Sequence, residues 1–399
     1  MSVALRVLAC FAAAAVPLLP AAHLRAADKP AAAAPAGVKP ADSKAIDLVL
    51  CLDVSSSMNG LIDSAKIKLW DVVNEMARLK PTPTLRVALY SYGHSTYPAG
   101  NGYVRKDVDL TGDLDDVYKA LNSLTINGGE EYVARVTKTA LTDQKWSADD
   151  GALKLIFVCG NEPANQDKQV SLDEAAALAK KGGVVVNTIY CGTGNNPEAR
   201  GWAAFAEQCG GRYVNIDQNK ATQQVVVKTE FDDQILKLNA QLNSTYVAYG
   251  KDGKEAAANQ VAQDANAAKA APSAPGAGAG AALARAESKV GGLYQNSRWD
   301  LVDRMKNDKA FDIKKLKDEE LCDDLKKLTP DERVAFVKKK ADERAELQKS
   351  IGDLVAKRQQ KVDEELAKKP KNPGEQALDE AVKGVVREQA KAKGFETAK

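Results

Sequence analysis

Histidine is almost absent from this chain, which has only two in 399 residues, His23 and His94. Hydrolases with a Ser–His–Asp set and histidine-based metalloproteases both depend on histidine chemistry. No G-x-S-x-G elbow, Walker loop or H-E-x-x-H motif accompanies His94, which we interpret as a hydrogen-bonded loop residue. A Ser–Lys mechanism around Lys66 or Lys68 is disfavoured, because helical spacing places both lysines toward solvent. We therefore expect a protein that is not an enzyme.

The chain also lacks a strong charge of one sign. It has 56 basic and 54 acidic residues and a formal net charge of +2, so nothing in the composition predicts nucleic acid as a partner. No cysteines have the C-x-x-C spacing of a zinc knuckle or a thioredoxin-like site. Cys191 and Cys209 flank one predicted helix, which leaves two possibilities, a disulfide between them or two buried free thiols.

Long apolar segments are confined to the N-terminus. Arg6 precedes an apolar segment at residues 7–22, which is shorter than the roughly 20 residues of a membrane-spanning helix. Small residues follow it, so we predict a signal peptide over residues 1–27 that is removed on export. The alternative is an uncleaved N-terminal anchor, which is the one membrane contact that the sequence suggests.

The composition divides the rest of the chain into four parts. Residues 28–44 are rich in Ala, Pro and Lys and are typical of a linker. Residues 45–248 alternate apolar and amphipathic segments and predict a folded domain. Residues 249–290 are rich in Ala, Gly and Pro and predict a second, low-complexity linker. Residues 291–399 are dense in charge of both signs and predict a helical region.

Strands alternate with helices across the predicted domain, which indicates an α/β fold with a Rossmann-like, mostly parallel sheet and helices on both faces. Residues 46–52 form an almost continuous apolar segment, as expected of a strand buried on both faces. Residues 103–110 alternate apolar and polar side chains, which suits an edge strand. Ligands of such sheets bind at the carboxyl ends of the strands. The loops after Asp53, around Gly128 and around Gly160 are therefore the candidate functional loops.

A D-x-S-x-S motif, formed by Asp53, Ser55 and Ser57, follows the first predicted strand. It resembles the metal-ion-dependent adhesion site (MIDAS) of the von Willebrand factor type A (VWA) family. A hard divalent cation prefers oxygen ligands, and this turn can aim one carboxylate and two hydroxyls at one point. The resemblance implies Mg²⁺, or Mn²⁺ or Ca²⁺, with an open position that an acidic group of a protein ligand completes. The alternative is that the two serines only cap the next helix.

The rest of the site departs from the family pattern. The family supplies a Thr from a second loop and an Asp from a third, but this chain has Glu130 and Asn161 at those places. Asn161 offers a carbonyl oxygen without charge, and Glu130 or Glu162 would restore the charge by pointing inward. Fewer oxygen ligands would lower the affinity for Mg²⁺ and favour the more flexible coordination of Ca²⁺. The resemblance thus implies a partly degenerate ligand set, made of Asp53, Ser55, Ser57, Glu130 and Asn161.

Residues 46–245 further resemble a subgroup of bacterial exported VWA proteins, through segments such as Leu61–Lys66 and Val186–Gly192. This resemblance implies a periplasmic, secreted or cell-surface location. Two functions remain open. One is a protein-binding, adhesion-type module that uses the metal site. The other is a structural or scaffold protein that binds no metal and assembles through its helical tail.

The charged tail contains one strong helix signal. Thr329-Pro330-Asp331-Glu332 combines a Thr cap, Pro at the first position and Glu at the third, so we predict a helix that reaches Lys369. The helix has a narrow apolar stripe that is too small to be buried alone. We expect it to pack on another helix, on a partner chain as in a coiled coil, or on Trp299 and Leu301. The stripe consists of Leu347, Ile351, Leu354, Val355, Val362 and Leu366.

Overall fold

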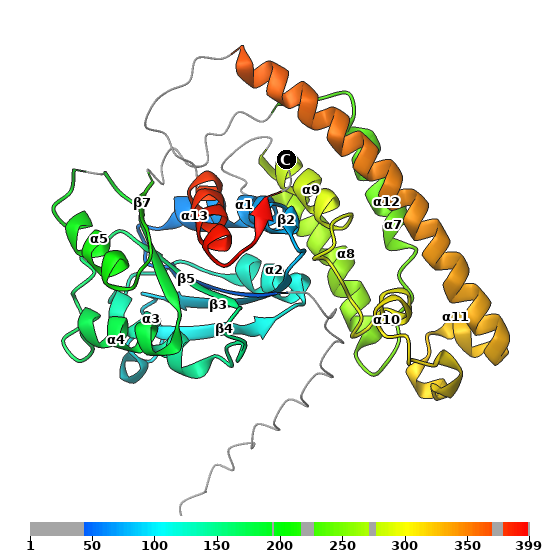
Figure 1. The fold of residues 1–399 in the computed structure, drawn as a ribbon, viewed down its shortest axis with the longest axis horizontal. Helices are drawn as coiled ribbons and strands as arrows, with labels where there is room; N and C mark the ends of the chain where they lie inside the picture. The colour runs from blue at the N-terminus through cyan, green and yellow to red at the C-terminus, as the bar shows by residue number, and fades with distance from the viewer. Residues whose placement is uncertain (1–43, 194, 217–226, 271–276, 369–377, 398–399) are drawn as a thin grey trace, which may run out of the picture. The chain divides into compact units, whose positions relative to one another are not determined.

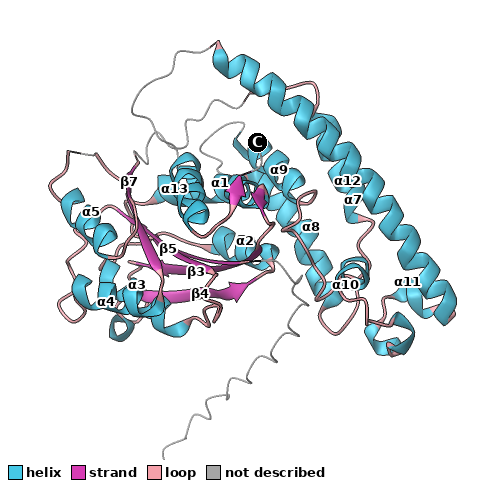
Figure 2. Cartoon of the chain, in the orientation of Figure 1, coloured by secondary structure: helices cyan, strands magenta, loops and turns pink. Residues whose placement is uncertain are grey.

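The computed structural model of the protein is shown in Figures 1 and 2. It describes residues 44–193, 195–216, 227–270, 277–368 and 378–397. The predicted signal peptide and all of the first predicted linker except Lys44 lie outside the described residues. No helix within the described ranges is long and apolar enough to cross a lipid bilayer.

A six-stranded sheet forms the centre of the α/β region, in the order β4-β3-β1-β5-β6-β7 (Figure 2). All neighbours are parallel except β3 and β4, which pair antiparallel at one edge. The structure thus confirms the mostly parallel sheet and the predicted edge strand. The strands are β1 (Ala45–Asp53), β3 (Thr84–Tyr92), β4 (Val104–Thr111), β5 (Leu153–Gly160), β6 (Val185–Tyr190) and β7 (Tyr213–Asn215).

Apolar side chains on both faces of β1 explain why helices cover the sheet on both sides. Ile46 and Leu48 belong to one core cluster, and Val49 and Cys51 to the other. Side chains of α1 and α2 belong to the first cluster, and those of α3, α4 and α5 belong to the second. Figure 1 shows the ribbons of these helices around the sheet. These helices are α1 (Asn59–Ala77), α2 (Leu114–Ser123), α3 (Val133–Asp143), α4 (Leu172–Gly182) and α5 (Ala199–Gln208).

The predicted low-complexity linker at residues 249–290 was wrong, because most of it is helical. Residues Gly253–Lys269 form α8 and residues Ala277–Ser288 form α9, which packs on α1. Helix α9 also packs closely on α8, where glycine is needed because a Cβ on Gly278 would lie 2.3 Å from the carbonyl oxygen of Ala268. The same composition that suggests a linker therefore suits two closely packed helices.

The charged region consists mainly of helices. The predicted long helix is confirmed as α12 (Pro330–Ala367), with the Thr329 and Glu332 capping box in place. Its apolar stripe packs on α7 (Asp232–Asn243), as one of the three alternatives proposed, although Leu366 remains 45% exposed. Short elements complete the chain: β2 (Leu79–Lys80), η1 (Ala99–Asn101), α10 (Leu301–Asn307), η2 (Ile313–Lys315), η3 (Asp318–Glu320) and α11 (Asp323–Lys326).

The last helix returns to the α/β region. Helix α13 (Leu378–Ala392) packs on α1, and β8 (Glu396–Thr397) pairs antiparallel with β2. Arg387 donates to Glu75 of α1 at 2.5 and 2.8 Å. Together α9 and α13 cover α1, so the folded unit extends beyond the boundary predicted at residue 248.

Candidate functional site

Four of the five predicted ligands come together at the carboxyl end of the sheet. Asp53 ends β1 with no exposed surface, and its Oδ1 accepts a 2.7 Å hydrogen bond from the Ser55 amide. The Ser55 and Ser57 hydroxyl oxygens lie 3.2 Å apart. Ser57 Oγ also lies 3.2 Å from Asn161 Oδ1 and 3.0 Å from Asn161 Nδ2, across from the end of β5.

The fifth predicted ligand, Glu130, does not join this group, but the next residue, Glu131, does. The Glu130 side chain is exposed, whereas its neighbour Glu131 is buried and lies beside Asp53. A Cβ built on Gly93 would sit 2.9 Å from Asp53 Oδ1 and 3.0 Å from Glu131 Cγ, which places both acids against that glycine. The sequence contained a signal that Glu131, and not Glu130, points inward. Glu131 lies two residues before Val133, the first buried apolar residue of α3, and alternate residues of an extended segment share a side.

Two glycines leave room around the Asp53 carboxylate. Gly93 has a φ of +83°, which side chains rarely adopt, so its position both requires glycine and keeps the space beside Asp53 open. A Cβ on Gly160 would lie 2.5 Å from the hydroxyl oxygen of Tyr92 and 3.2 Å from Asp53 Oδ2. Sequence analysis identified the Gly160 loop but missed Gly93, which follows β3.

One oxygen of each carboxyl group lacks a hydrogen-bond partner among the described residues. Among the residues that the structure describes, no donor reaches the buried Asp53 Oδ2 or Glu131 Oε2, and neither acid forms an ion pair with a lysine or arginine. Burial raises the pKa of Asp53, and burial together with the Asp53 carboxylate raises the pKa of Glu131 further. Without a cation, the pair is therefore most stable when it shares a proton.

The side chains present fit a hard divalent cation. Two carboxylates, two hydroxyls and one amide form an all-oxygen set that carries negative charge. The described part of the chain contains no group of three or more His, Cys, Asp or Glu residues able to hold a metal. A cation at this place would therefore need the hydroxyls of Ser55 and Ser57 and the Asn161 carbonyl for its remaining oxygens.

Of the two alternatives for Cys191 and Cys209, the structure has two buried free thiols and no disulfide between them. Cys191 packs in the core cluster on the α1 side of the sheet, whereas Cys209 packs in the cluster on the α3 side. The sheet separates the two side chains: Cys191 follows β6 and Cys209 follows α5. His94 accepts or donates a 2.9 Å hydrogen bond with the Thr96 hydroxyl, as its interpretation as a loop residue predicts.

Comparison with known proteins matches residues 47–228 to the model of the von Willebrand factor type A domain. Proximal thread matrix protein 1 from the mussel byssus, with a zinc-occupied MIDAS motif, is 17% identical with a TM-score of 0.36. That match covers 45% of this chain and 44% of the mussel protein, so it spans less than half the length of either.

Two other solved structures show the same range of similarity. The SpRpn10 VWA domain is 17% identical with a TM-score of 0.34, over 46% of this chain and 100% of that domain. An aerotolerance-related membrane protein from Bacteroides fragilis is 13% identical with a TM-score of 0.32, over 44% of this chain and 94% of that one. Among curated proteins, no sequence matches this chain.

Proposed function

We propose that the von Willebrand factor type A domain at residues 47–228 holds a divalent cation and uses it to bind an acidic group of a protein partner. VWA domains commonly mediate protein–protein interaction. The observation that supports the proposal is the pair of buried carboxylate oxygens, Asp53 Oδ2 and Glu131 Oε2, that receive no hydrogen bond from the described residues. Burying two such groups is costly unless a positive charge compensates them.

Each side chain has a distinct role in this proposal. Asp53 and Glu131 supply the negative charge, and binding of a cation displaces their shared proton. Ser55 and Ser57 would supply neutral oxygens from the loop after β1, and Asn161 would supply one from the loop after β5. The cation, when bound, supplies a positive centre that attracts a carboxylate. An all-oxygen set favours Mg²⁺, Mn²⁺ or Ca²⁺ over Zn²⁺, for which nitrogen and sulfur ligands are more common.

The test is calorimetric titration of the full chain with Mg²⁺, Mn²⁺ and Ca²⁺. We expect saturable binding that is lost in Asp53→Ala and about tenfold weaker in Glu131→Gln, because one carboxylate is removed. The matched control is Glu130→Gln, which makes the same change one residue away on an exposed side chain and should bind like wild type. No heat, and no change in melting temperature with millimolar cation, would rule the proposal out.

A second experiment addresses the partner's acidic group. Bound Mn²⁺ with an open position holds exchangeable water, which increases the relaxation rate of bulk water protons. A short peptide with one Glu should lower that rate by replacing the water, whereas the same peptide with Gln should leave it unchanged. Equal effects of the two peptides would show that the cation does not select an acidic ligand.

The reciprocal contact of Ser57 with Asn161 favours the second function, a scaffold without metal. The Asn161 amide lies within hydrogen-bond distance of Ser57 Oγ through both its oxygen and its nitrogen, so these two side chains have protein partners without a cation. In a scaffold, Asp53→Ala would change partner capture little. Assembly would instead depend on the exposed part of α12, and Leu366→Lys would lower the sedimentation coefficient.

We also propose that the protein is exported, on the basis of the N-terminal apolar segment and the small residues that follow it. Mass spectrometry of protein recovered from the periplasm or cell surface should show the loss of residues 1–27. An intact N-terminus in fractionated cells would favour the uncleaved anchor.

A further inference from the structure

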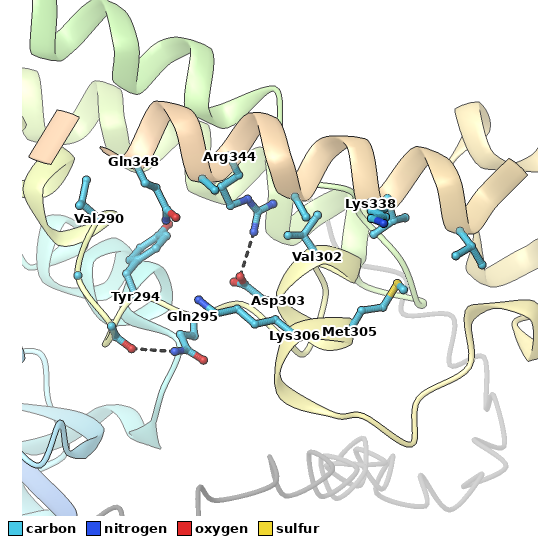
Figure 3. Close-up of a pocket in the computed structure, with 16 residues that line it drawn as sticks. Val290, Tyr294, Gln295, Val302, Asp303, Met305, Lys306, Lys338, Arg344 and Gln348 are labelled. Atoms are coloured by element: carbon cyan, nitrogen blue, oxygen red, sulfur yellow. Dashed lines mark hydrogen bonds and ion pairs between the residues drawn. The ribbon is translucent and has the colours of Figure 1, made fainter. Parts of the chain in front are cut away.

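A cavity of about 420 Å³ lies outside the VWA domain, between residues 290–306 and α12 (Figure 3). This volume is typical of sites for small molecules, which range from roughly 300 to 1,000 Å³. None of the residues that line it belongs to the proposed cation site, so the inference below does not depend on that function.

Apolar side chains form the walls of the cavity. Val302 and Val337 are almost fully buried beside it, and Met305, Val334 and Ala341 complete the lining from α10 and α12. Such walls favour a ligand with a hydrocarbon or aromatic body, because apolar contact replaces water there.

The buried polar groups of the cavity already have partners. Arg344 lies 2.7 Å from Asp300 Oδ2 and 3.0 Å from Asp303 Oδ1, and Figure 3 shows the ion pair with Asp303 at the cavity. The Tyr294 hydroxyl donates to Asp115 at 2.5 Å. These groups fix the shape of the site without offering a free charge.

Two lysines give the cavity its charge. Three cations and one carboxylate line it, and Asp303 already pairs with Arg344. Lys306 comes from α10 and Lys338 from α12, on opposite walls, and Lys306 extends toward Gln295 in Figure 3. Within the described residues, neither lysine forms an ion pair with a carboxylate, and both are exposed. The cavity therefore combines apolar walls with excess positive charge at its edge.

We infer that this cavity binds a small organic carboxylate with an apolar body. The carboxylate pairs with an ammonium group at the edge of the cavity, from Lys306 or Lys338, and the apolar body lies against Val302 and Val337. An inorganic anion gains nothing from the apolar walls, and a neutral apolar molecule gains nothing from the two ammonium groups. The ligand class follows from the presence of both features in one site.

The test is a calorimetric titration of the full chain with octanoate. We expect one saturable site, about tenfold weaker binding in the double variant Lys306→Gln/Lys338→Gln, and little binding of octanol or inorganic phosphate. The matched control is Lys339→Gln/Lys349→Gln, which removes two exposed lysines of α12 that do not line the cavity. Ala341→Trp should also abolish binding by filling the space.

Two results would overturn the inference. One is the absence of octanoate binding to the wild-type chain, and the other is equal binding by the lysine variant and its control. Asp53→Ala separates this site from the cation site. It should bind octanoate like wild type even if it no longer binds a divalent cation, so failure of either proposal leaves the other testable.

Discussion

The carboxyl groups of Asp53 and Glu131 face the same small space beside Gly93, and each has a buried oxygen that no other described group satisfies. Two acids in such surroundings cannot both ionise without cost. This relationship makes the site sensitive to protons and to cations, and the first two predictions follow from it.

The stability of the metal-free protein should depend on pH through Glu131. Its folded-state pKa is raised by burial and by Asp53, so its contribution to stability is complete below the unfolded pKa of about 4.3 and is lost as pH rises through the folded value. Between pH 5 and pH 9, wild type should lose at least about 1 kcal/mol of unfolding free energy relative to Glu131→Gln. Urea denaturation in EDTA measures this, and Glu130→Gln should follow wild type. Parallel pH profiles for wild type and Glu131→Gln would contradict it.

Asn161→Asp should strengthen cation binding. The change adds a third carboxylate to the site and removes the amide nitrogen that lies 3.0 Å from Ser57 Oγ. We expect an affinity for Mg²⁺ about tenfold higher and lower stability without metal, because the added charge is then unpaired. The matched control, Asn165→Asp, places the same charge at an exposed position of the same loop. Equal gains in the two variants would indicate a general effect of charge rather than coordination.

The buried Arg285 should be essential for attaching the helical region. Its guanidinium lies 2.7 Å from Asp115 of α2 and 2.6 Å from Asp264 of α8. Arg285→Met leaves two buried carboxylates with fewer partners and should cost about 3–5 kcal/mol in chemical denaturation. Arg298→Met removes an ion pair to Asp113 from a half-exposed side chain and should cost less than about 1 kcal/mol. Similar losses for both variants would contradict a central role for Arg285.

Truncation after Lys368 should expose the face of α1 that α13 covers. The deletion removes the buried side chains of Val382, Val386 and Phe395 and the ion pair to Glu75. We expect faster amide hydrogen exchange in α1 and a lower melting temperature, and a synthetic peptide of residues 378–399 should restore both. A peptide with Phe395→Ala is the control. Unchanged exchange in α1 after truncation would show that α13 contributes little to this region.

The five cysteines of the described region should react as free thiols. All five lack disulfide partners, and four of them are buried. The unfolded chain should therefore give the same thiol count with and without reductant. Two extra thiols after reduction, absent in Cys209→Ser, would indicate a disulfide in the isolated protein.

Residue patterns predict the α/β region well because its signals are local. The continuous apolar segment of β1 and the alternation in β4 both appear in the sheet as expected. The capping box at Thr329 likewise marks the first turn of α12, since every partner in it lies within four residues. Periodicity of this kind depends only on near neighbours along the chain.

The errors have a common physical cause, which is dependence on distant contacts. The Ala- and Gly-rich segment is helical because α1 provides a surface on which small side chains pack closely, and Asn74 donates to the Ala284 carbonyl at 2.8 Å. The place of Glu131 beside Asp53 also involves Gly93, almost forty residues earlier in the chain, although the local alternation with Val133 already distinguishes Glu131 from Glu130. Cys191 and Cys209 lie on opposite sides of the sheet, and this placement also depends on the whole fold.

The packing of the last helix, α13, on the first helix, α1, has a consequence for synthesis. Lys44 precedes β1 and donates to the Lys393 carbonyl at 2.8 Å, across 349 positions of sequence. A ribosome makes the N-terminal end first, so α1 forms long before the residues that cover it exist. Until residues 378–397 emerge, the nascent chain carries an open apolar surface, and a chaperone that shields it would have to be displaced by the protein's own C-terminus.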